Sequence, residues 1–284
     1  MASTKEIRGQ IKAIQNTGKI TKAMEMVAAS KMRKAQDRVV AARAYSEGIL
    51  RVVGNLMSAH PEYKHPFLVE REEIKRVGVI VVTTDKGLCG GLNTNALKTA
   101  LGLLKEQEVD VDVFTIGRRA GSFMRRIGAP VLGVAENIPD TPELSDIIGL
   151  VTLAIDKYIA GDVDAVHLVY SEFVNTMTQT PTTMRLMPCP LPEKTDERYW
   201  DYLYEPEAKE VLEGVLRRYV ESLVYHALLE NKACEQSARM VAMKAATDNA
   251  KDIVKDLSIT YNKARQAAIT QELAEICAGA AAAG

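Results

Sequence analysis

The ten prolines of this 284-residue chain are confined to its middle. All of them lie between Pro61 and Pro206, so residues 1–60 and 207–284 contain none. Proline normally makes up about 5% of a sequence, and it interrupts helices because it lacks an amide N–H and its ring clashes with the preceding turn. Each end of the chain can therefore form one long uninterrupted helix, and the middle is expected to be organised differently.

The N-terminal segment, residues 1–60, has the pattern of a coiled-coil helix. Ser3 and Glu6 have the spacing of a capping box, which predicts a helix that begins near Thr4. Spacings of three and four residues then separate a series of apolar or small side chains, a pattern that is interrupted at Thr21, Glu25 and Ser46. The series is Ile7, Ile11, Ile14, Gly18, Ala28, Met32, Ala35, Val39, Ala42, Ile49, Val53 and Leu56.

The C-terminal segment, residues 207–284, has a matching pattern. Pro206 suits the first turn of a helix, and nothing interrupts the pattern before Gly279. The same three-and-four spacing runs through a second series, in which only Thr247 is polar. The series is Met240, Met243, Thr247, Ala250, Val254, Leu257, Tyr261, Ala264 and Ala268. At 1.5 Å per residue the two helices would extend roughly 80 and 110 Å, so we expect an antiparallel coiled coil that projects as a rod.

The middle segment, residues 61–206, alternates between strand and helix patterns. The expected strands are 77–84, 111–116, 131–134, 165–174 and an edge strand at 182–187. The expected helices are 93–105, 118–127 and 143–158. The fold class is therefore α/β: a long antiparallel coiled coil of the N- and C-terminal helices with an inserted small α/β (Rossmann-like) domain.

Charge is distributed unevenly although the formal net charge is only -1. Residues 1–60 hold 11 Lys and Arg against 4 Asp and Glu, whereas residues 61–206 hold 15 against 22. The basic segment contains a single aromatic residue, Tyr45, which argues against nucleic-acid binding by stacking. No apolar run is long enough to span a membrane, so any membrane role would be peripheral.

Neither the cysteines nor the histidines indicate a catalytic or metal site. Cys89, Cys189, Cys234 and Cys277 are too scattered for a disulfide framework, and we interpret them as inert small apolar residues of a reducing compartment. The glycine-rich turn at residues 85–91 follows a strand, but it matches neither a P-loop nor a dinucleotide fingerprint. A nucleotide-binding α/β protein and a generic coiled-coil scaffold nevertheless stay open as alternatives.

Four sequence stretches resemble the signatures of the gamma subunit of bacterial rotary ATP synthase. They are Met24 to Met32, Asp85 to Gly91, Arg239 to Asn249 and Thr270 to Ile276, and they occur in the family's order across essentially the whole chain. The resemblance implies a non-catalytic central rotor shaft that transmits torque between a proton-driven c-ring and a catalytic alpha/beta hexamer. It couples proton transport to ATP synthesis or hydrolysis, with the catalytic sites on beta.

The resemblance also implies partners, location and contact residues. One copy per complex would contact the alpha, beta and epsilon subunits and the membrane c-ring, without a cofactor, a metal or nucleic acid. The protein would lie peripherally on the cytoplasmic face of the cell inner membrane and would meet the membrane only through the complex. Residues that match the family's beta-contact positions are Met24, Arg239, Arg265, Gln266, Thr270 and Glu272, and those that match its c-ring contact are Tyr202, Tyr204 and Glu205.

Overall fold

The computed structural model describes residues 4–59, 65–71, 73–189 and 208–283. It contains two very long helices, α1 (Thr4–Ala59) and α5 (Ala208–Ala283), at the two ends of the chain. The predicted start of the first helix near Thr4 is confirmed. Helix α5 continues past Gly279 through the alanine-rich end, where alanine has the highest helix propensity of any residue.

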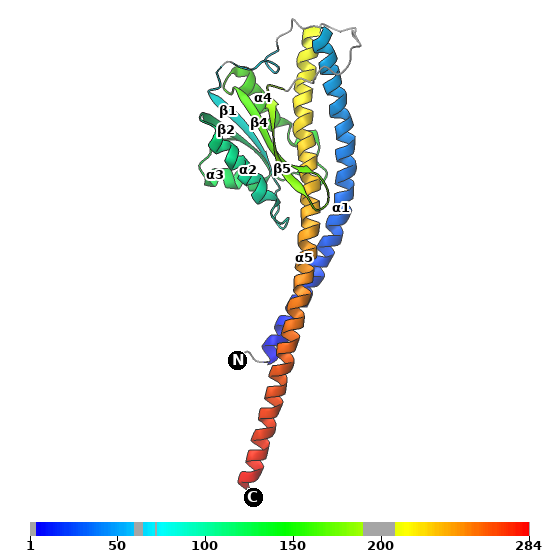
Figure 1. The fold of residues 1–284 in the computed structure, drawn as a ribbon, viewed down its shortest axis with the longest axis vertical. Helices are drawn as coiled ribbons and strands as arrows, with labels where there is room; N and C mark the ends of the chain where they lie inside the picture. The colour runs from blue at the N-terminus through cyan, green and yellow to red at the C-terminus, as the bar shows by residue number, and fades with distance from the viewer. Residues whose placement is uncertain (1–3, 60–64, 72, 190–207, 284) are drawn as a thin grey trace. The chain divides into compact units, whose positions relative to one another are not determined.

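The sequence between the long helices forms an α/β sheet (Figure 1). Its strands are β1 (Arg76–Val82), β2 (Asp110–Ile116), β3 (Val131–Ala135), β4 (Ala165–Phe173) and β5 (Gln179–Met187). Its helices are α2 (Leu92–Glu106), α3 (Arg118–Arg126), the short 3-10 helix η1 (Leu144–Asp146) and α4 (Ile148–Ala160). All five predicted strands are present, with boundaries that shift by a few residues.

The strand order is β3-β2-β1-β4-β5. The first four strands in this order pair in parallel, and β5, which is at the edge as the sequence predicts, pairs antiparallel with β4. The predicted helix 143–158 is replaced by η1 followed by α4. The Glu143 side chain accepts a hydrogen bond from the backbone N–H of Asp146, and the Asp146 side chain accepts one from the backbone N–H of Glu143. This reciprocal capping makes η1 a separate short turn.

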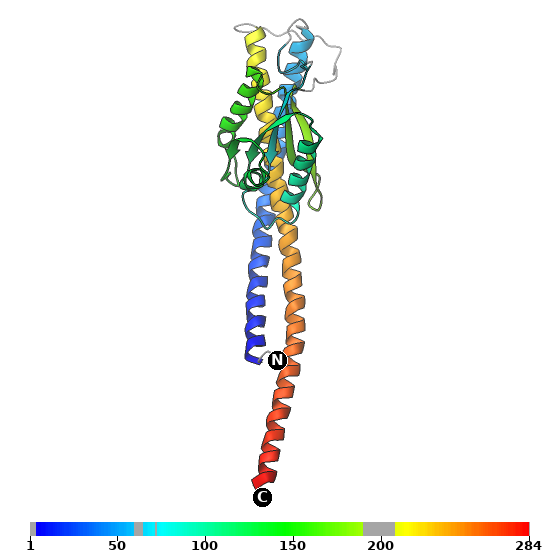
Figure 2. The ribbon, with the colours of Figure 1, turned by 90° about the vertical axis from the view of Figure 1, so that its left-hand side faces the viewer.

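The chain divides into two compact units. The coiled-coil unit consists of Met1–Ala28 with Met240–Gly284, and the sheet unit consists of Ala29–Arg239. In each unit α1 and α5 lie side by side (Figures 1 and 2). The three-part division at residues 60 and 206 that the proline distribution suggests stays a prediction.

The core of the sheet unit has two layers, one on each face of the sheet. On one face α4 and the Val220 side of α5 cover buried residues such as Ile80 and Phe114. On the other face α2 and α3 cover Val79 and Val113. Strand β1 is buried along almost its whole length because both faces of the sheet are covered, which explains its nearly continuous apolar sequence.

Candidate functional site

The glycine turn, residues 85–91, connects β1 to α2 and is held tightly by side chains at its two ends. The Thr84 hydroxyl donates to the Lys86 carbonyl at 2.5 Å, and the Thr84 N–H donates to Oδ1 of Asn93 at 3.1 Å. Asn93 returns a hydrogen bond from its Nδ2 to the Thr84 hydroxyl at 2.8 Å. Leu88 has a φ of 63° in this turn and its side chain is 63% exposed. The turn is therefore a fixed shape rather than an open loop.

Asp85 joins the glycine turn to two other segments at the same end of the sheet. Its Oδ1 accepts the N–H of Arg118 at the start of α3 at 2.9 Å. Its Oδ2 accepts the N–H of Ile138, which follows β3, at 2.8 Å. Because these are the carboxyl ends of parallel strands, one carboxylate can bridge the loops of neighbouring strands.

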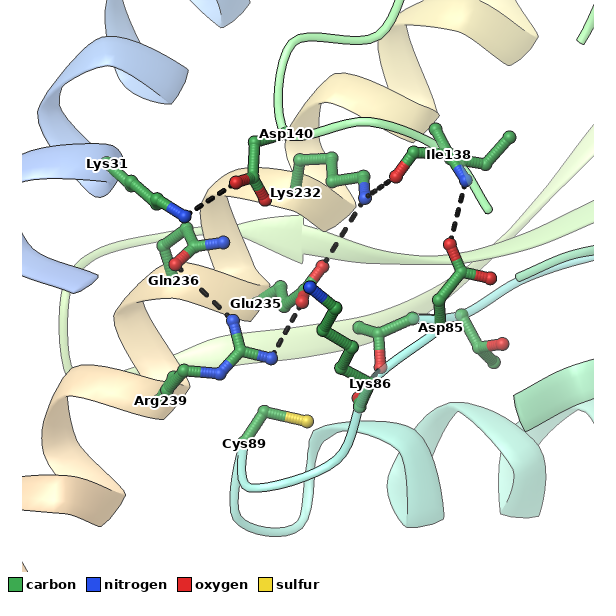
Figure 3. A network of polar contacts seen from close by, with 12 residues as sticks. Lys31, Asp85, Lys86, Cys89, Ile138, Asp140, Lys232, Glu235, Gln236 and Arg239 are labelled. Carbon is green, nitrogen blue, oxygen red and sulfur yellow. Dashed lines mark hydrogen bonds and ion pairs between the residues drawn. The ribbon is translucent and has the colours of Figure 1, made fainter. Parts of the chain in front are cut away.

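Helix α5 contacts the same two loops through Lys232 and Arg239, and Glu235 joins these two side chains in one network (Figure 3). Lys232 Nζ donates to the Ile138 carbonyl at 3.0 Å, and Arg239 Nη2 donates to the Gly87 carbonyl at 3.1 Å. Glu235 lies between them, 2.7 Å from Arg239 Nη2 and 3.7 Å from Lys232 Nζ. The three side chains are only 8%, 5% and 12% exposed for Lys232, Glu235 and Arg239.

Helix α1 reaches the same region through one exposed ion pair. Lys31 Nζ lies 2.6 Å from Oδ2 of Asp140 (Figure 3). The hydrogen bond from Lys31 lowers the pKa of Asp140 below its ordinary value. Both side chains are nearly half exposed, so this pair contributes little to stability.

In the coiled-coil unit the two helices pack through small residues. A Cβ built on Gly18 would lie 3.5 Å from the Cβ of Ala250, so the two backbones approach closely there. Two of the polar residues in the predicted series meet each other, since the Oγ1 atoms of Thr21 and Thr247 are 2.7 Å apart. These contacts pair rising residue numbers in α1 with falling numbers in α5, which confirms the antiparallel arrangement.

The predicted beta-contact residues fall into two groups. Four of them, Arg265, Gln266, Thr270 and Glu272, are exposed on one stretch of α5 in the coiled-coil unit, and Met24 is half-buried on α1 of that unit. Arg239 belongs to the sheet unit, where its guanidinium is already bonded to Glu235 and Gly87. The predicted c-ring residues Tyr202, Tyr204 and Glu205 lie outside the described residues.

Sequence reasoning missed Lys232 and Glu235, and it singled out Asp85 only as part of the glycine turn. Lys232, Glu235 and Arg239 lie three and four residues apart on α5, which is the spacing of ordinary solvated ion pairs, so the pattern gives no sign of burial. In the structure every residue from Ala227 to Ser237 is buried, because this part of α5 is enclosed on all sides. Only the unusual density of polar residues inside an otherwise core-forming helix could have drawn attention to them.

The thiols and acidic residues do not form a metal site within the described part of the chain, where no group of three or more His, Cys, Asp or Glu side chains could hold an ion. Cys89, Cys189 and Cys234 are free and buried, which agrees with their interpretation as small apolar residues. Burial raises the pKa of the Cys189 thiol to about 12. Cys277 is free and exposed, so its interpretation as an inert small apolar residue stays a prediction.

A family model described as ATP synthase matches residues 3–283, which assigns the chain to the subunits of that enzyme. The ATP synthase gamma chain of Thiobacillus denitrificans is 56% identical over 289 residues, covering 99% of this chain and 100% of that one. The gamma chain of Legionella pneumophila (strain Corby) is 53% identical with the same coverage. The chain belongs to the ATP synthase gamma chain family.

Solved structures agree with this assignment. The central stalk and c-ring structure of the Tetrahymena thermophila mitochondrial ATP synthase contains a chain that is 25% identical, with a TM-score of 0.60, covering 80% of this chain and 99% of that one. A rotor chain of the Euglena gracilis mitochondrial ATP synthase shares the fold at a TM-score of 0.66 and 19% identity, covering 94% of this chain and 98% of that one.

Membership of the family defines the role of the chain. Gamma is the rotor shaft in the central stalk of ATP synthase, and it is a non-catalytic subunit, because the catalytic sites are on beta. It is a peripheral part of a membrane complex. In the described part of the chain, no helix has the length and apolar character needed to cross a membrane.

Proposed function

We propose that the helices of the coiled-coil unit turn inside a hexamer of alternating alpha and beta subunits, as a single copy per complex. The sheet unit would bind the epsilon subunit, and the segment with Tyr202, Tyr204 and Glu205 would contact the membrane c-ring. No cofactor is needed on this chain. The complex would sit on the cytoplasmic face of the cell inner membrane.

One observation supports this arrangement above others: α5 continues as an exposed helix beyond its pairing with α1. The alternating burial of the coiled coil ends at Ala264, and residues 265–280 are all exposed. Figure 2 shows α5 continuing past the N-terminal end of α1. Three of them are large and apolar, with Ile269, Leu273 and Ile276 48%, 58% and 68% exposed. An isolated helix of this length is only marginally stable in water, so an enclosing partner would stabilise it.

The predicted contact residues lie in this exposed stretch or beside it. Arg265 and Glu272 are opposite charges seven residues apart, which places them two turns apart on one side of the helix. Such side chains could exchange charge-assisted hydrogen bonds with polar loops of beta. The half-buried Met24 supplies a soft apolar contact that does not fix one orientation.

The mechanism follows from differential contact. An asymmetric shaft presents a different side to each of three beta subunits, so each catalytic site adopts a different conformation at a given angle. Rotation then moves these conformations around the ring. Each charge that crosses the membrane potential supplies about 2.3 kcal/mol per 100 mV, and the shaft transmits that work.

Reconstitution with purified alpha and beta tests the proposal. We expect one copy of this chain per hexamer and ATP hydrolysis that depends on it. A complex that forms without the chain at full activity, or a different copy number, would refute the proposal. ATP binding by the chain alone, measured by calorimetry, would instead favour the nucleotide-binding alternative.

Single substitutions test the contact residues. Arg265→Gln and Glu272→Gln should each change the turnover of the assembled complex more than its assembly. Lys263→Gln is a matched control, because Lys263 is exposed on the same helix but is not among the predicted contacts. Normal turnover with lost assembly in the first two variants would show that these residues act as assembly contacts only.

A further inference from the structure

The contacts between α5 and the loops of the sheet unit close into a ring. Ile138 donates its N–H to Asp85 and accepts Lys232 at its carbonyl. Lys232 pairs with Glu235, Glu235 pairs with Arg239, and Arg239 donates to the Gly87 carbonyl. Gly87 is two residues from Asp85, so the chain itself completes the circuit. We call the four charged side chains Asp85, Lys232, Glu235 and Arg239 the polar ring (Figure 3).

The polar ring contains two carboxylates and two cations, so it balances its own charge. This matters because the three members on α5 are nearly buried, and an uncompensated charge in such a place is strongly unfavourable. Glu235 holds the central position, since it is the one carboxylate that faces both cations. Neutralising Glu235 alone leaves two buried cations against one half-buried carboxylate, Asp85.

The polar ring supplies something that the apolar core does not. Apolar contacts between α5 and the sheet are non-directional. They therefore resist separation of the helix from the sheet more strongly than they resist rotation of the helix about its own axis. Hydrogen bonds weaken steeply when their angles change. Two of the bonds from α5 reach main-chain carbonyls, those of Gly87 after β1 and Ile138 after β3. A twist of α5 on the sheet would therefore bend both bonds at once.

We propose that the polar ring fixes the rotational position of α5 on the sheet unit, with Glu235 as its positioning residue, so that torque passes between the helix and the sheet without slip. The inference rests on the proposed function as a rotating shaft. It also assigns Arg239 to a contact within the chain, in addition to the predicted contact with beta.

Glu235→Gln is the primary variant because it removes the charge and keeps the shape. Glu221→Gln is the matched control: the Glu221 side chain is also 5% exposed on α5, but its ion-pair partner at 2.8 Å is Arg218, whose side chain is 63% exposed and does not belong to the polar ring. Loss of one partner from a buried ion pair costs about 3 kcal/mol or more, so hydrogen exchange at the Ile138 amide should accelerate on the order of 10²-fold in Glu235→Gln. The control should leave exchange at that amide unchanged.

A mechanical measurement separates positioning from stability alone. In the reconstituted complex a bead is attached to a cysteine introduced by Lys98→Cys on the exposed side of α2, in a background with Cys277→Ala. We expect the angular variance of the bead during pauses to increase in Glu235→Gln and to stay at the parent value in Glu221→Gln. Faster exchange with unchanged variance, or an equal increase in both variants, would overturn the proposal.

A second variant covers the case in which Glu235→Gln does not fold. The double variant with Lys232→Met and Glu235→Gln removes one charge of each sign, so the remaining Asp85 and Arg239 still balance. It should assemble like the parent and still show increased angular variance, because Ile138 has lost its donor from α5. Parent-like variance in the double variant would refute the role of the polar ring. Failure of the parent chain to assemble or rotate would instead refute the proposed function.

Discussion

The pairing of Thr21 with Thr247 in the coiled-coil unit allows a quantitative test. Besides their mutual contact at 2.7 Å, Thr21 donates to the Gly18 carbonyl at 3.1 Å and Thr247 to the Met243 carbonyl at 2.8 Å. Each hydroxyl has a single hydrogen, so only two of these three contacts form at one time. Replacing one threonine by valine therefore removes the cross-helix bond, while the other hydroxyl can still donate to its own helix.

The expected magnitudes follow from this geometry. Loss of the bond should cost about 1 kcal/mol in either Thr21→Val or Thr247→Val, because the new methyl group faces a hydroxyl. In the double variant two methyl groups face each other, and each buried methyl contributes about 0.8 kcal/mol. The double variant should therefore be more stable than the sum of the single effects predicts, by about 1 kcal/mol, or a factor of roughly five in the opening equilibrium.

Hydrogen exchange measured by mass spectrometry on peptides 17–25 and 243–251 reports this opening. Thr260→Val is the control, because the Thr260 hydroxyl is exposed and donates to the Asp256 carbonyl of its own helix at 3.0 Å. Its effect should be independent of the residue at position 21. If the free-energy changes of Thr21→Val and Thr247→Val add up to that of the double variant within about 0.3 kcal/mol, the cross-helix bond is refuted.

Three further predictions concern stability, pH and accessibility. Gly18→Ala should stabilise the coiled-coil unit by about 1 kcal/mol, because alanine has the higher helix propensity and its Cβ would meet Ala250 at an ordinary 3.5 Å. In Asp164→Asn the melting temperature should decrease less as the pH is lowered than it does in the parent protein. Burial opposes ionisation of Asp164, but two backbone N–H groups and Arg71 at 2.8 Å lower its pKa below the ordinary 3.8. The folded protein then holds fewer protons than the unfolded chain, so this stabilisation is present above the unfolded pKa and is lost as pH falls through the lowered folded pKa. Cys277 should react rapidly with maleimide in the isolated chain and slowly in the complex, since it is exposed on the stretch of α5 that we place inside the hexamer.

Each of these predictions has a contrasting control or outcome. Gly9→Ala has no atom within 4 Å of the new Cβ and should gain propensity alone, so a loss of stability at Gly18 only would mean that the helices are closer than the structure shows. Asp162→Asn removes an exposed carboxylate, and an acid profile as flat as that of Asp164→Asn would contradict the special role of Asp164. Equal reactivity of Cys277 before and after assembly would contradict the enclosure of α5.

The long helices and the strands were predictable because they depend on local sequence. The pattern of small residues in the coiled coil matches the observed burial from Ile7 to Val53, and β1 was recognisable as a run of apolar residues. The pairing of Thr21 with Thr247 was not predictable, since the spacing within each helix does not determine which residues face each other across the pair. The sequence series ended at Ala268, whereas Ala268 is exposed, because α5 has already passed the start of α1.

The polar ring was beyond sequence reasoning for a related reason. Lys232, Glu235 and Arg239 have the spacing of solvated charges, and the partners that bury them are the main-chain atoms of distant loops. A main-chain acceptor has no sequence signal of its own. The glycine turn could be recognised as an unusual loop, but its attachment to α5 through Gly87 could not.

The use of main-chain acceptors has a consequence for how freely this loop can be redesigned. Because α5 holds the Gly87 carbonyl, this hydrogen bond does not use the neighbouring side chains of Lys86 and Leu88, which are exposed. A combinatorial library at these two positions should therefore tolerate wide variation in charge at Lys86, and at Leu88 it should tolerate the residues that accept a positive φ, with β-branched residues disfavoured. The turn can be given a new outward surface for a different partner while its anchorage to the helix is retained.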